Sequence, residues 1–218
     1  MTVSKSKRRP GRPSRSDQLQ VDYDACLDRA IEGFAERGFD GVSLREIAAE
    51  AGVSHGLLNA RYGTKLGLWT AAVDHGMERL RRRMIESQAQ WAPDADLEQQ
   101  VLATCIDFLE AVADFPAIVQ LINSEGARGG ERLDHITETF MRGRIWPLTT
   151  LLQEGRAKGI FRNVPVMIPF TLVAHGAGAL VALRPMMDTL GSRLGSEPDS
   201  RSQMIAMAAE IIVRGLKA

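Results

Sequence analysis

Apolar residues recur every three to four positions along most of the chain. Cys26, Ala30 and Phe34 follow one another at intervals of four, and Gly38 closes this first run. Such spacing places apolar side chains on one face of an α-helix, so the run predicts a first helix. The same criterion predicts longer helices from 65 onward, at about 97–114, from 116 onward, and at about 131–158, 166–188 and 199–215. We find no convincing strand or internal repeat, and the pattern predicts an all-α fold.

Capping residues mark two further short helices between the first run and residue 65. Ser43 precedes one of them, and Glu46 three residues later completes a capping-box pattern. Ser54 can cap the next helix, and Thr64 can cap the long helix that follows. Only the turn Ala51-Gly52-Val53-Ser54 separates the two short helices. This arrangement is typical of a helix-turn-helix.

The apolar residues of this segment predict which side of its second helix is free. Ile47 and Ala48 face inward from the first short helix, Leu58 fills the contact, and Gly52 permits the sharp turn. The second helix then presents outward His55, Gly56, Asn59, Ala60, Leu57 and Tyr62. Asparagine can pair with adenine, and leucine or alanine can contact a thymine methyl in a major groove. The alternative is an ordinary αα-corner with a polar outer face.

The first sixteen residues form a basic arm that contains no acidic residue. Its six cations are Lys5, Lys7, Arg8, Arg9, Arg12 and Arg15, although the chain of 218 residues has no net charge overall. Proline, glycine and serine accompany them, which is the composition of a flexible segment. The segment Arg8 to Pro13 resembles the core of an AT-hook, so Arg8, Arg9 and Arg12 are expected in a DNA minor groove. A solvated tail is the alternative.

The composition excludes several other classes of protein. With 44% hydrophobic residues the chain has enough apolar side chains for a folded core. Cys26 and Cys105 suggest no disulfide framework, and no Cys/His group has zinc spacing. No apolar run has the length of a membrane span and no signal peptide is visible, so we expect a cytoplasmic protein without a membrane partner. We also find no nucleophile elbow, metal set or phosphate loop, and an enzyme is not expected.

Residues 20 to 75 resemble the DNA-binding domain of TetR-type (TetR/AcrR) transcriptional regulators. The resemblance is carried by Phe-Ala-x-x-Gly-Phe at the end of the first helix, by Ile-Ala-x-x-Ala-Gly-Val-Ser at the turn, and by Tyr62 followed by Lys65. Beside the flexible arm at 1–16 that the composition predicts, it implies a three-helix helix-turn-helix domain at 17–68 and a larger helical effector-binding and dimerisation domain at 69–218. It also implies that Ser43 and Tyr62 contact the DNA backbone and that Lys65 approaches a phosphate.

The complete set of residues expected at the DNA comes from this resemblance together with the outward face. It comprises Ser43, Arg45, Ser54, His55, Gly56, Leu57, Asn59, Ala60, Arg61, Tyr62, Thr64 and Lys65. Two positions depart from the family pattern: Asn59 stands where an aromatic residue is usual, and Leu66 where an acidic one is common. The operator sequence of a relative therefore cannot be transferred to this chain.

Aromatic residues of the C-terminal part are candidates for an effector pocket. They are Trp91, Phe108, Phe115, Phe140, Trp146 and Phe170. Aromatic residues on helices are also ordinary core residues, which is the alternative for each of them. His175 stands on an apolar helix, where a core or interface histidine is the simpler interpretation.

A stripe of small residues on the helix predicted at 166–188 suggests close helix packing. The stripe is Thr171, Ala174, Gly178 and Ala182, and the last helix offers a matching apolar face with Ile205, Ala208 and Ile212. TetR-type dimers, which the chain resembles, join through a four-helix bundle built from the last two long helices of each subunit. These residues are therefore expected at a homodimer interface. A core within one subunit is the alternative.

Together these features predict a transcriptional regulator that binds palindromic double-stranded operator DNA as a homodimer. By resemblance it is a repressor that an unidentified small-molecule effector releases, with no cofactor and no metal. An activator, a regulator without a ligand and a sequence-neutral architectural DNA binder remain open as alternatives.

Overall fold

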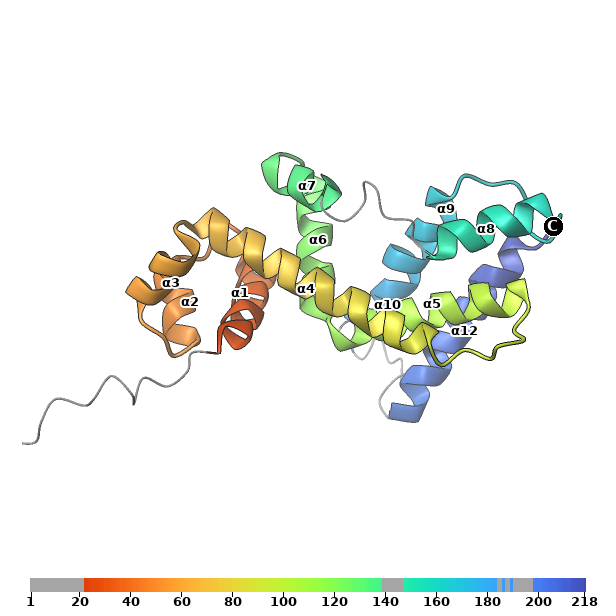
Figure 1. Ribbon diagram of the computed structural model, residues 1–218, viewed down its shortest axis with the longest axis horizontal. Helices are drawn as coiled ribbons and strands as arrows, with labels where there is room; N and C mark the ends of the chain where they lie inside the picture. Colours follow the sequence, from red (N-terminus) through yellow and green to blue (C-terminus); the bar gives the residue numbers. More distant parts are fainter. Residues whose placement is uncertain (1–21, 139–146, 184–185, 187–188, 190–197) are drawn as a thin grey trace, which may run out of the picture.

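The computed structural model describes residues 22–138, 147–183, 186, 189 and 198–218, and helices dominate this part of the chain (Figure 1). The elements, in chain order, are α1 (Tyr23–Arg37), α2 (Leu44–Glu50), α3 (His55–Tyr62), α4 (Lys65–Gln88), α5 (Leu97–Asp114), α6 (Pro116–Arg128), α7 (Glu131–Ile136), α8 (Pro147–Ala157), α9 (Met167–Thr171), the π-helix η3 (Leu172–Ala177), α10 (Gly178–Ala182) and α12 (Pro198–Leu216). The described ranges contain no strand, only an isolated bridge between Phe161 and Lys217. The expected all-α fold is confirmed.

Helices α1, α2 and α3 lie together at one end of the molecule (Figure 1). The long helix α4 runs from this group to α5, so it crosses the expected boundary between domains at residue 68. Helix α5 packs against α4, α8, α10 and α12 and forms the centre of the other end. Helix α6 packs on α1, α4 and α7 between the two ends.

The expected ends of the N-terminal helices agree with the structure because local chemistry sets them. Asp22 caps the start of α1, and Gly38, which follows the last residue of α1, has a positive φ of 71°. Ser43, Ser54 and Thr64 each accept a hydrogen bond from a backbone N–H in the first turn of α2, α3 and α4. These bonds satisfy amides that have no partner within their own helix.

The C-terminal helices differ in detail from their expected ranges. The helix expected at 131–158 is seen at both ends, as α7 and α8, whereas 139–146 lie outside the described residues. The helix expected at 166–188 is helical from Met167 to Ala182, but its middle widens into the π-helix η3. A π-turn inserts an extra residue into a helix and rotates the side chains that follow, which spacing of apolar residues does not reveal.

Both cysteines are buried free thiols in the core. Burial raises the pKa of the Cys105 thiol to about 12. The pKa of the Cys26 thiol is also raised, mainly by burial and to a smaller extent by the negative charge of the nearby Asp22 carboxylate. Both thiols therefore stay protonated at neutral pH and pack as small apolar side chains. Within the described ranges no helix combines the length and apolar content that crossing a membrane requires.

Helices α1, α4 and α6 meet at Gly76. A Cβ atom at this position would lie 2.9 Å from Ile118 Cδ1 of α6 and 2.9 Å from Ile31 Cδ1 of α1. Both isoleucines are buried, so neither side chain can move without displacing other core residues. The glycine allows α4 to pass closely between the N-terminal helices and α6.

Replacing Gly76 by alanine should lower the free energy of unfolding by about 1 kcal/mol. Overpacking costs about 1 to 3 kcal/mol, and removing a glycine from a helix returns about 0.5 to 1 kcal/mol. Gly126→Ala on α6 is the matched control: nothing lies within 4 Å of its added Cβ, so it should stabilise the protein. Chemical denaturation measures both variants. Equal stabilisation by the two substitutions would contradict the tight approach at Gly76.

Candidate nucleic-acid interface and internal cavity

Capping bonds fix where α2 and α3 begin. The Ser43 backbone N–H donates to Glu46 Oε2 at 2.8 Å, and the Glu46 N–H donates to Ser43 Oγ at 3.2 Å. Hydrogen bonds from the Ser43 side chain and from its backbone N–H to the Glu46 carboxyl lower the pKa of that carboxyl, which stays ionised at the start of α2. The Leu57 N–H donates to Ser54 Oγ at 3.2 Å in the same way. The sequence pattern that predicted both caps is confirmed.

The turn between α2 and α3 has the backbone geometry that its sequence suggests. Gly52 has a φ of 68°, a conformation that residues with a Cβ rarely adopt. The Val53 N–H donates to the Ala48 carbonyl at 2.9 Å and closes the end of α2. Ile47 and Leu58 are fully buried beneath the turn. The angle between α2 and α3 is therefore fixed by both backbone and core contacts.

The outer face of α3 is free in the described structure. His55, Gly56, Asn59, Ala60 and Arg61 are exposed, and Leu57 and Tyr62 are half-buried. Ser43, Arg45, Ser54 and Thr64 are exposed around this helix at the starts of α2, α3 and α4. The structure thus brings the whole expected set to one end of the molecule, where α2 and α3 project (Figure 1).

The link from α3 to α4 is short and tightly packed. Gly63 turns the chain with a φ of 72°, and the Gly67 N–H donates to Thr64 Oγ1 at 2.9 Å. A Cβ at Gly67 would lie 2.2 Å from the Tyr62 carbonyl oxygen, so α3 sits directly against the first turn of α4. Burial raises the pKa of the Tyr62 hydroxyl, which therefore remains a hydrogen-bond donor at neutral pH.

Two contacts attach α1 to the helix-turn-helix. The Arg37 guanidinium donates to both oxygens of Glu50, at 2.9 and 3.2 Å, and so joins α1 to α2. The Arg61 guanidinium lies 4.7 Å from the centre of the Tyr23 ring, which joins α3 to α1. Arg61 is nevertheless exposed, so its donors can also reach a nearby phosphate.

Phe39 connects a candidate DNA contact with the C-terminal helices. Lys65 Nζ lies 4.4 Å from the ring centre of Phe39 and donates to its carbonyl oxygen at 2.9 Å. The Arg132 guanidinium of α7 also lies 4.4 Å from this ring centre. Arg132 Nε is 2.9 Å from Oε2 of Glu125, whose side chain is only 1% exposed. Arg132 and Glu125 thus form an ion pair, but the Arg132 Nε–H is not oriented toward the Glu125 oxygen as a hydrogen bond requires.

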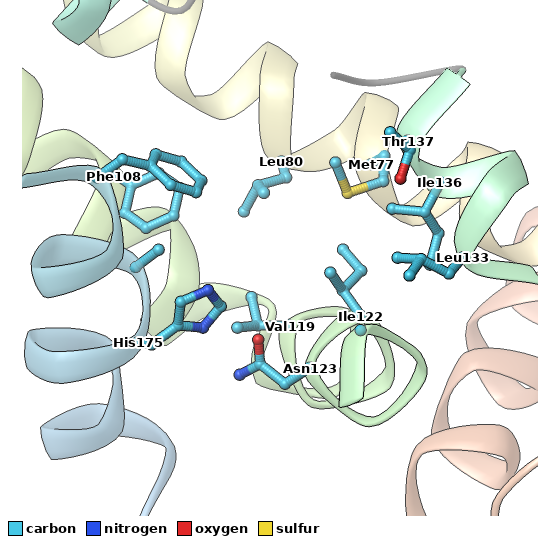
Figure 2. Close-up of a pocket in the computed structure, with 13 residues that line it drawn as sticks. Met77, Leu80, Phe108, Val119, Ile122, Asn123, Leu133, Ile136, Thr137 and His175 are labelled. Atoms are coloured by element: carbon cyan, nitrogen blue, oxygen red, sulfur yellow. The ribbon is translucent and has the colours of Figure 1, made fainter. Parts of the chain in front are cut away.

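A cavity of about 360 Å³ lies between α4, α5, α6, α7 and the α9–η3 segment (Figure 2). Its lining residues are Met77, Leu80, Phe108, Val119, Ile122, Asn123, Gly126, Leu133, Ile136, Thr137, Phe170, Ala174 and His175. Pockets of about 300 to 1,000 Å³ with mostly apolar walls and a few polar groups are typical of small-molecule sites. The cavity is therefore a candidate effector site.

The candidate pocket aromatics fall into three groups. Phe108 and Phe170 line the cavity. Trp91 does not, because its Nε1 donates to Asp107 Oδ2 at 2.7 Å, and Phe115 packs beneath the Arg79 guanidinium. Phe140 and Trp146 lie outside the described residues, as do Arg8, Arg9 and Arg12 of the basic arm.

The structure places some candidate interface residues inside the subunit. Ala174 and Ile205 are buried, and a Cβ at Gly178 would face Val112 of α5 at 3.9 Å. Ala174 lies within the π-helix η3 and Gly178 directly follows it, so the two middle residues of the small stripe are buried within the subunit. Thr171 is exposed, Ala208 and Ile212 are half-buried, and nothing is described of the Ala182 side chain. Large exposed apolar residues lie instead at Met167, Ile168, Leu172, Leu183, Met186, Met207 and Ile211.

Sequence reasoning missed Phe39, Arg132 and Glu125, as well as the polar cavity residues Asn123 and Thr137. Lys65 lies 26 positions from Phe39, and no local motif connects them. Arg132 and Glu125 are charged residues on short helices, which a sequence alone presents as solvated. Only the packing of α7 beside α6 and α4 shows that Arg132 reaches both the buried Glu125 and the Phe39 ring.

Comparisons with known proteins agree with this geometry. Residues 27–72 match the family described as bacterial regulatory proteins, tetR family. An HTH-type transcriptional repressor of Mycobacterium tuberculosis is 43% identical over 65 residues, which cover 30% of this chain and 34% of the relative. The match thus spans about a third of the length of this curated relative.

Solved structures extend the likeness to the whole fold. A TetR family transcription regulator from Marinobacter aquaeolei superposes with a TM-score of 0.66 at 16% identity, covering 91% of this chain and 98% of that one. The ketosteroid transcriptional regulator of Mycobacterium tuberculosis gives 0.62 at 18% identity, covering 92% and 97%. Residues 27–72 of this chain thus match the tetR family of bacterial regulatory proteins, and the fold of the described chain is similar to that of solved TetR family regulators.

Proposed function

We propose that this protein is a transcriptional regulator that represses its target by binding a palindromic operator as a homodimer and that releases the operator when a small molecule binds. The observation that carries the proposal is the exposed face of α3, held against a buried turn. A rigid helix with free polar side chains is the element that enters a major groove in helix-turn-helix proteins. The repressor named among the relatives supports the direction of regulation.

In this proposal the residues around α3 divide into two roles. Asn59 and His55 face outward from α3 and read base edges, because an asparagine amide can bond adenine in two places. Lys65 and Arg61 contact phosphates, which supplies affinity without sequence preference. The basic arm with Arg8, Arg9 and Arg12 adds further charge contacts and remains a prediction from the sequence.

The homodimer is proposed to form through the exposed apolar residues of the C-terminal helices. Ile168 and Leu172 are half exposed and four positions apart in the α9–η3 segment, and Ile211 on α12 is 73% exposed. Helices α12 and η3 pack against each other, so these residues belong to neighbouring elements. Two-fold pairing of such a surface would bury it and place two α3 helices at the two half-sites.

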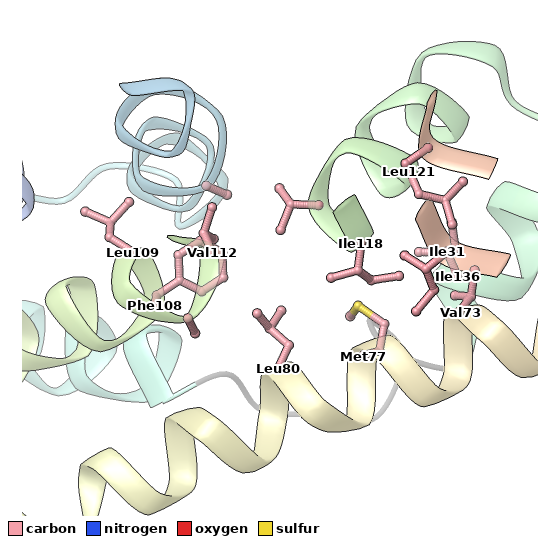
Figure 3. Packing of buried hydrophobic residues seen from close by; sticks show 14 of the residues in the cluster. Ile31, Val73, Met77, Leu80, Phe108, Leu109, Val112, Ile118, Leu121 and Ile136 are labelled. Atoms are coloured by element: carbon pink, nitrogen blue, oxygen red, sulfur yellow. The ribbon is translucent and has the colours of Figure 1, made fainter. Parts of the chain in front are cut away.

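Release by a small molecule requires a path from the cavity to α3. Figure 3 shows buried side chains in two groups along α4, one around Phe108 and another around Ile118, Ile31 and Ile136. The second group joins α6 and α7, which form cavity walls, to α1 of the DNA-binding end. A ligand that favours another placement of these walls would shift the N-terminal helices by the same packing.

Helix α7 is the most direct part of this path. Ile136 and Leu133 face the cavity, whereas Arg132 lies over Phe39 and His135 Nε2 lies 2.8 Å from Asp74 Oδ1 of α4. One short helix thus touches both the cavity and the residue that seats Lys65. Movement of α7 would change the surroundings of Lys65 at the DNA.

Replacing Asn59 by alanine should relax base preference at one position of each half-site. A bidentate contact is worth about 1 to 3 kcal/mol of discrimination, so roughly a tenfold to hundredfold preference should disappear. Competition gel shifts with single-base operator variants measure this. Arg29→Ala, on the exposed side of α1, is the control and should preserve preference. Unchanged selectivity in the Asn59 variant would assign base reading to other residues.

Replacing Ile211 by aspartate should dissociate the dimer at micromolar protein, because each subunit would place a charge in an apolar contact. Operator affinity should then fall at least tenfold, since a single half-site offers fewer contacts. Ile85→Asp is the matched control, because Ile85 is also an exposed isoleucine but lies on α4. Sedimentation equilibrium distinguishes the two variants. An Ile211 variant that stays dimeric would place the interface elsewhere.

The double substitution Glu125→Gln with Arg132→Gln should weaken operator binding about threefold or more, within the range of about 0.5 to 2 kcal/mol found for coupled sites. The pair of substitutions leaves no unpaired buried charge and removes the cation from the Phe39 ring. Fluorescence anisotropy with labelled operator measures the change. In a Phe39→Leu background the same double substitution should have no further effect; a full additional effect there would exclude the path through Phe39.

A further inference from the structure

We propose that Tyr23, the first residue of α1, is a positioning residue for DNA binding: its ring keeps the Arg61 guanidinium of α3 in place before a DNA phosphate binds to it. The inference rests on the proposed function, in which Arg61 contacts a phosphate. It goes further because it assigns a role to a residue outside the helix-turn-helix and makes the order of one side chain part of the affinity.

Local hydrogen bonding fixes the position of Tyr23. Helix α1 begins at Tyr23, and the Asp22 side chain caps this helix by accepting a hydrogen bond from the Ala25 N–H at 3.1 Å. The cap satisfies a backbone amide of the first turn and sets where the helix begins. Tyr23 is half-buried, so neighbouring residues restrict its side chain. The ring therefore projects from an ordered helical turn.

The Tyr23 ring restrains Arg61 from the side of α1. Arg61 Cζ lies 4.7 Å from the ring centre, within the distance of about 6 Å at which a ring face attracts a cation. The same guanidinium acts on the neighbouring Tyr62 hydroxyl: burial raises the pKa of this hydroxyl, and its hydrogen bond with Arg61 opposes the rise. Two aromatic side chains, one from α1 and one from α3, thus limit the positions that Arg61 can take.

The contact with Tyr23 leaves the hydrogen-bond donors of Arg61 available. A guanidinium carries five N–H donors in its plane, whereas attraction to a ring face acts through the charge and needs none of them. Arg61 is exposed, so a molecule arriving from solvent can reach these donors. Their planar arrangement fits two oxygens of one phosphate. The side chain is thus held in place and still able to bind an anion.

The position of Arg61 within α3 favours a phosphate over a base. In helix-turn-helix proteins, the N-terminal residues of the recognition helix contact the base edges. Arg61 lies instead in the last turn of α3, next to the turn at Gly63, and its guanidinium lies against α1. An unrestrained arginine would have to be ordered when the phosphate binds, which weakens binding. Restraint by Tyr23 before binding therefore increases the affinity for DNA.

A double-mutant cycle between Tyr23→Leu and Arg61→Ala tests the inference. Fluorescence anisotropy measures the binding of each full-length variant to a palindromic duplex, selected from a random pool by the wild-type protein, and to a scrambled duplex of equal length. Tyr23→Leu should weaken both complexes about fivefold, because ordering one long side chain weakens binding by about twofold to tenfold in each subunit. In the Arg61→Ala background the same substitution should have no further effect. A full additional effect there overturns the proposal.

The salt dependence of binding separates positioning of Arg61 from general damage to the interface. Arg61→Ala removes one phosphate contact and should reduce the slope of log affinity against log salt by about 0.9 per half-site. Tyr23→Leu keeps the cation, so the slope should stay at the wild-type value while the affinity falls. Tyr23→Phe keeps the ring and should bind as the wild type does. An unchanged slope in Arg61→Ala, an equal loss of slope in Tyr23→Leu, or weak binding by Tyr23→Phe overturns the proposal.

Arg82→Ala is the matched control, because Arg82 is an exposed arginine on α4 about 25 Å along the helix from Lys65. It should keep both the affinity and the salt slope of the wild type. Thermal unfolding of every variant verifies that each one is folded at the temperature of the titrations.

The inference and the proposed function can fail separately in this experiment. Equal binding of both duplexes by the wild-type protein overturns the proposed function, but the cycle is still read on either duplex because phosphate contacts carry no sequence preference. Specific binding of the palindromic duplex that Tyr23→Leu does not weaken overturns the role of Tyr23 alone. Binding of neither duplex overturns both.

Discussion

The close approach of α1, α4 and α6 at Gly76 is the contact on which the arrangement of the two ends depends. Helix α4 belongs to both ends, since its first turn carries α3 and its middle supplies Met77 and Leu80 to the cavity. Ile31 and Ile118 approach the glycine from opposite partners, so the N-terminal helices cannot shift on α4 without disturbing α6. The packing thus makes the N-terminal helices and the cavity parts of one mechanical unit.

Local chemistry explains why the N-terminal part could be predicted from sequence. Ser43, Ser54 and Gly52 act within a few residues of their own positions, through caps and a turn whose geometry depends little on the rest of the fold. The outer face of α3 followed from the same signals, because the burial of Leu58 leaves only one side of a short helix free.

The orientation of side chains in the C-terminal part could not be predicted, because it depends on contacts between helices that the spacing of apolar residues does not encode. Gly178 directly follows the π-helix η3 and faces Val112 of α5, and the spacing of apolar residues does not reveal a π-helix. Trp91 is drawn to Asp107 by one hydrogen bond, and Phe115 is covered by Arg79, so two of the candidate pocket aromatics serve as local packing. Phe108 and Phe170 were identifiable as aromatic, but their orientation toward one cavity required the whole helical arrangement.

Because α3 is packed rigidly on the start of α4, a small tilt of α4 produces a larger displacement of α3. A Cβ at Gly67 would collide with the Tyr62 carbonyl, so the end of α3 packs too closely against the first turn of α4 for the two helices to move independently. Helix α4 extends about 22 Å from Leu80 in the cavity wall to Lys65, at about 1.5 Å per residue. If α4 tilts by about 8° about Leu80, its first residue, Lys65, moves by about 3 Å. That displacement is close to the roughly 3.4 Å rise between successive base pairs. In the proposed operator complex, a motion too small to open the core would therefore be enough to move α3 out of register with its half-site.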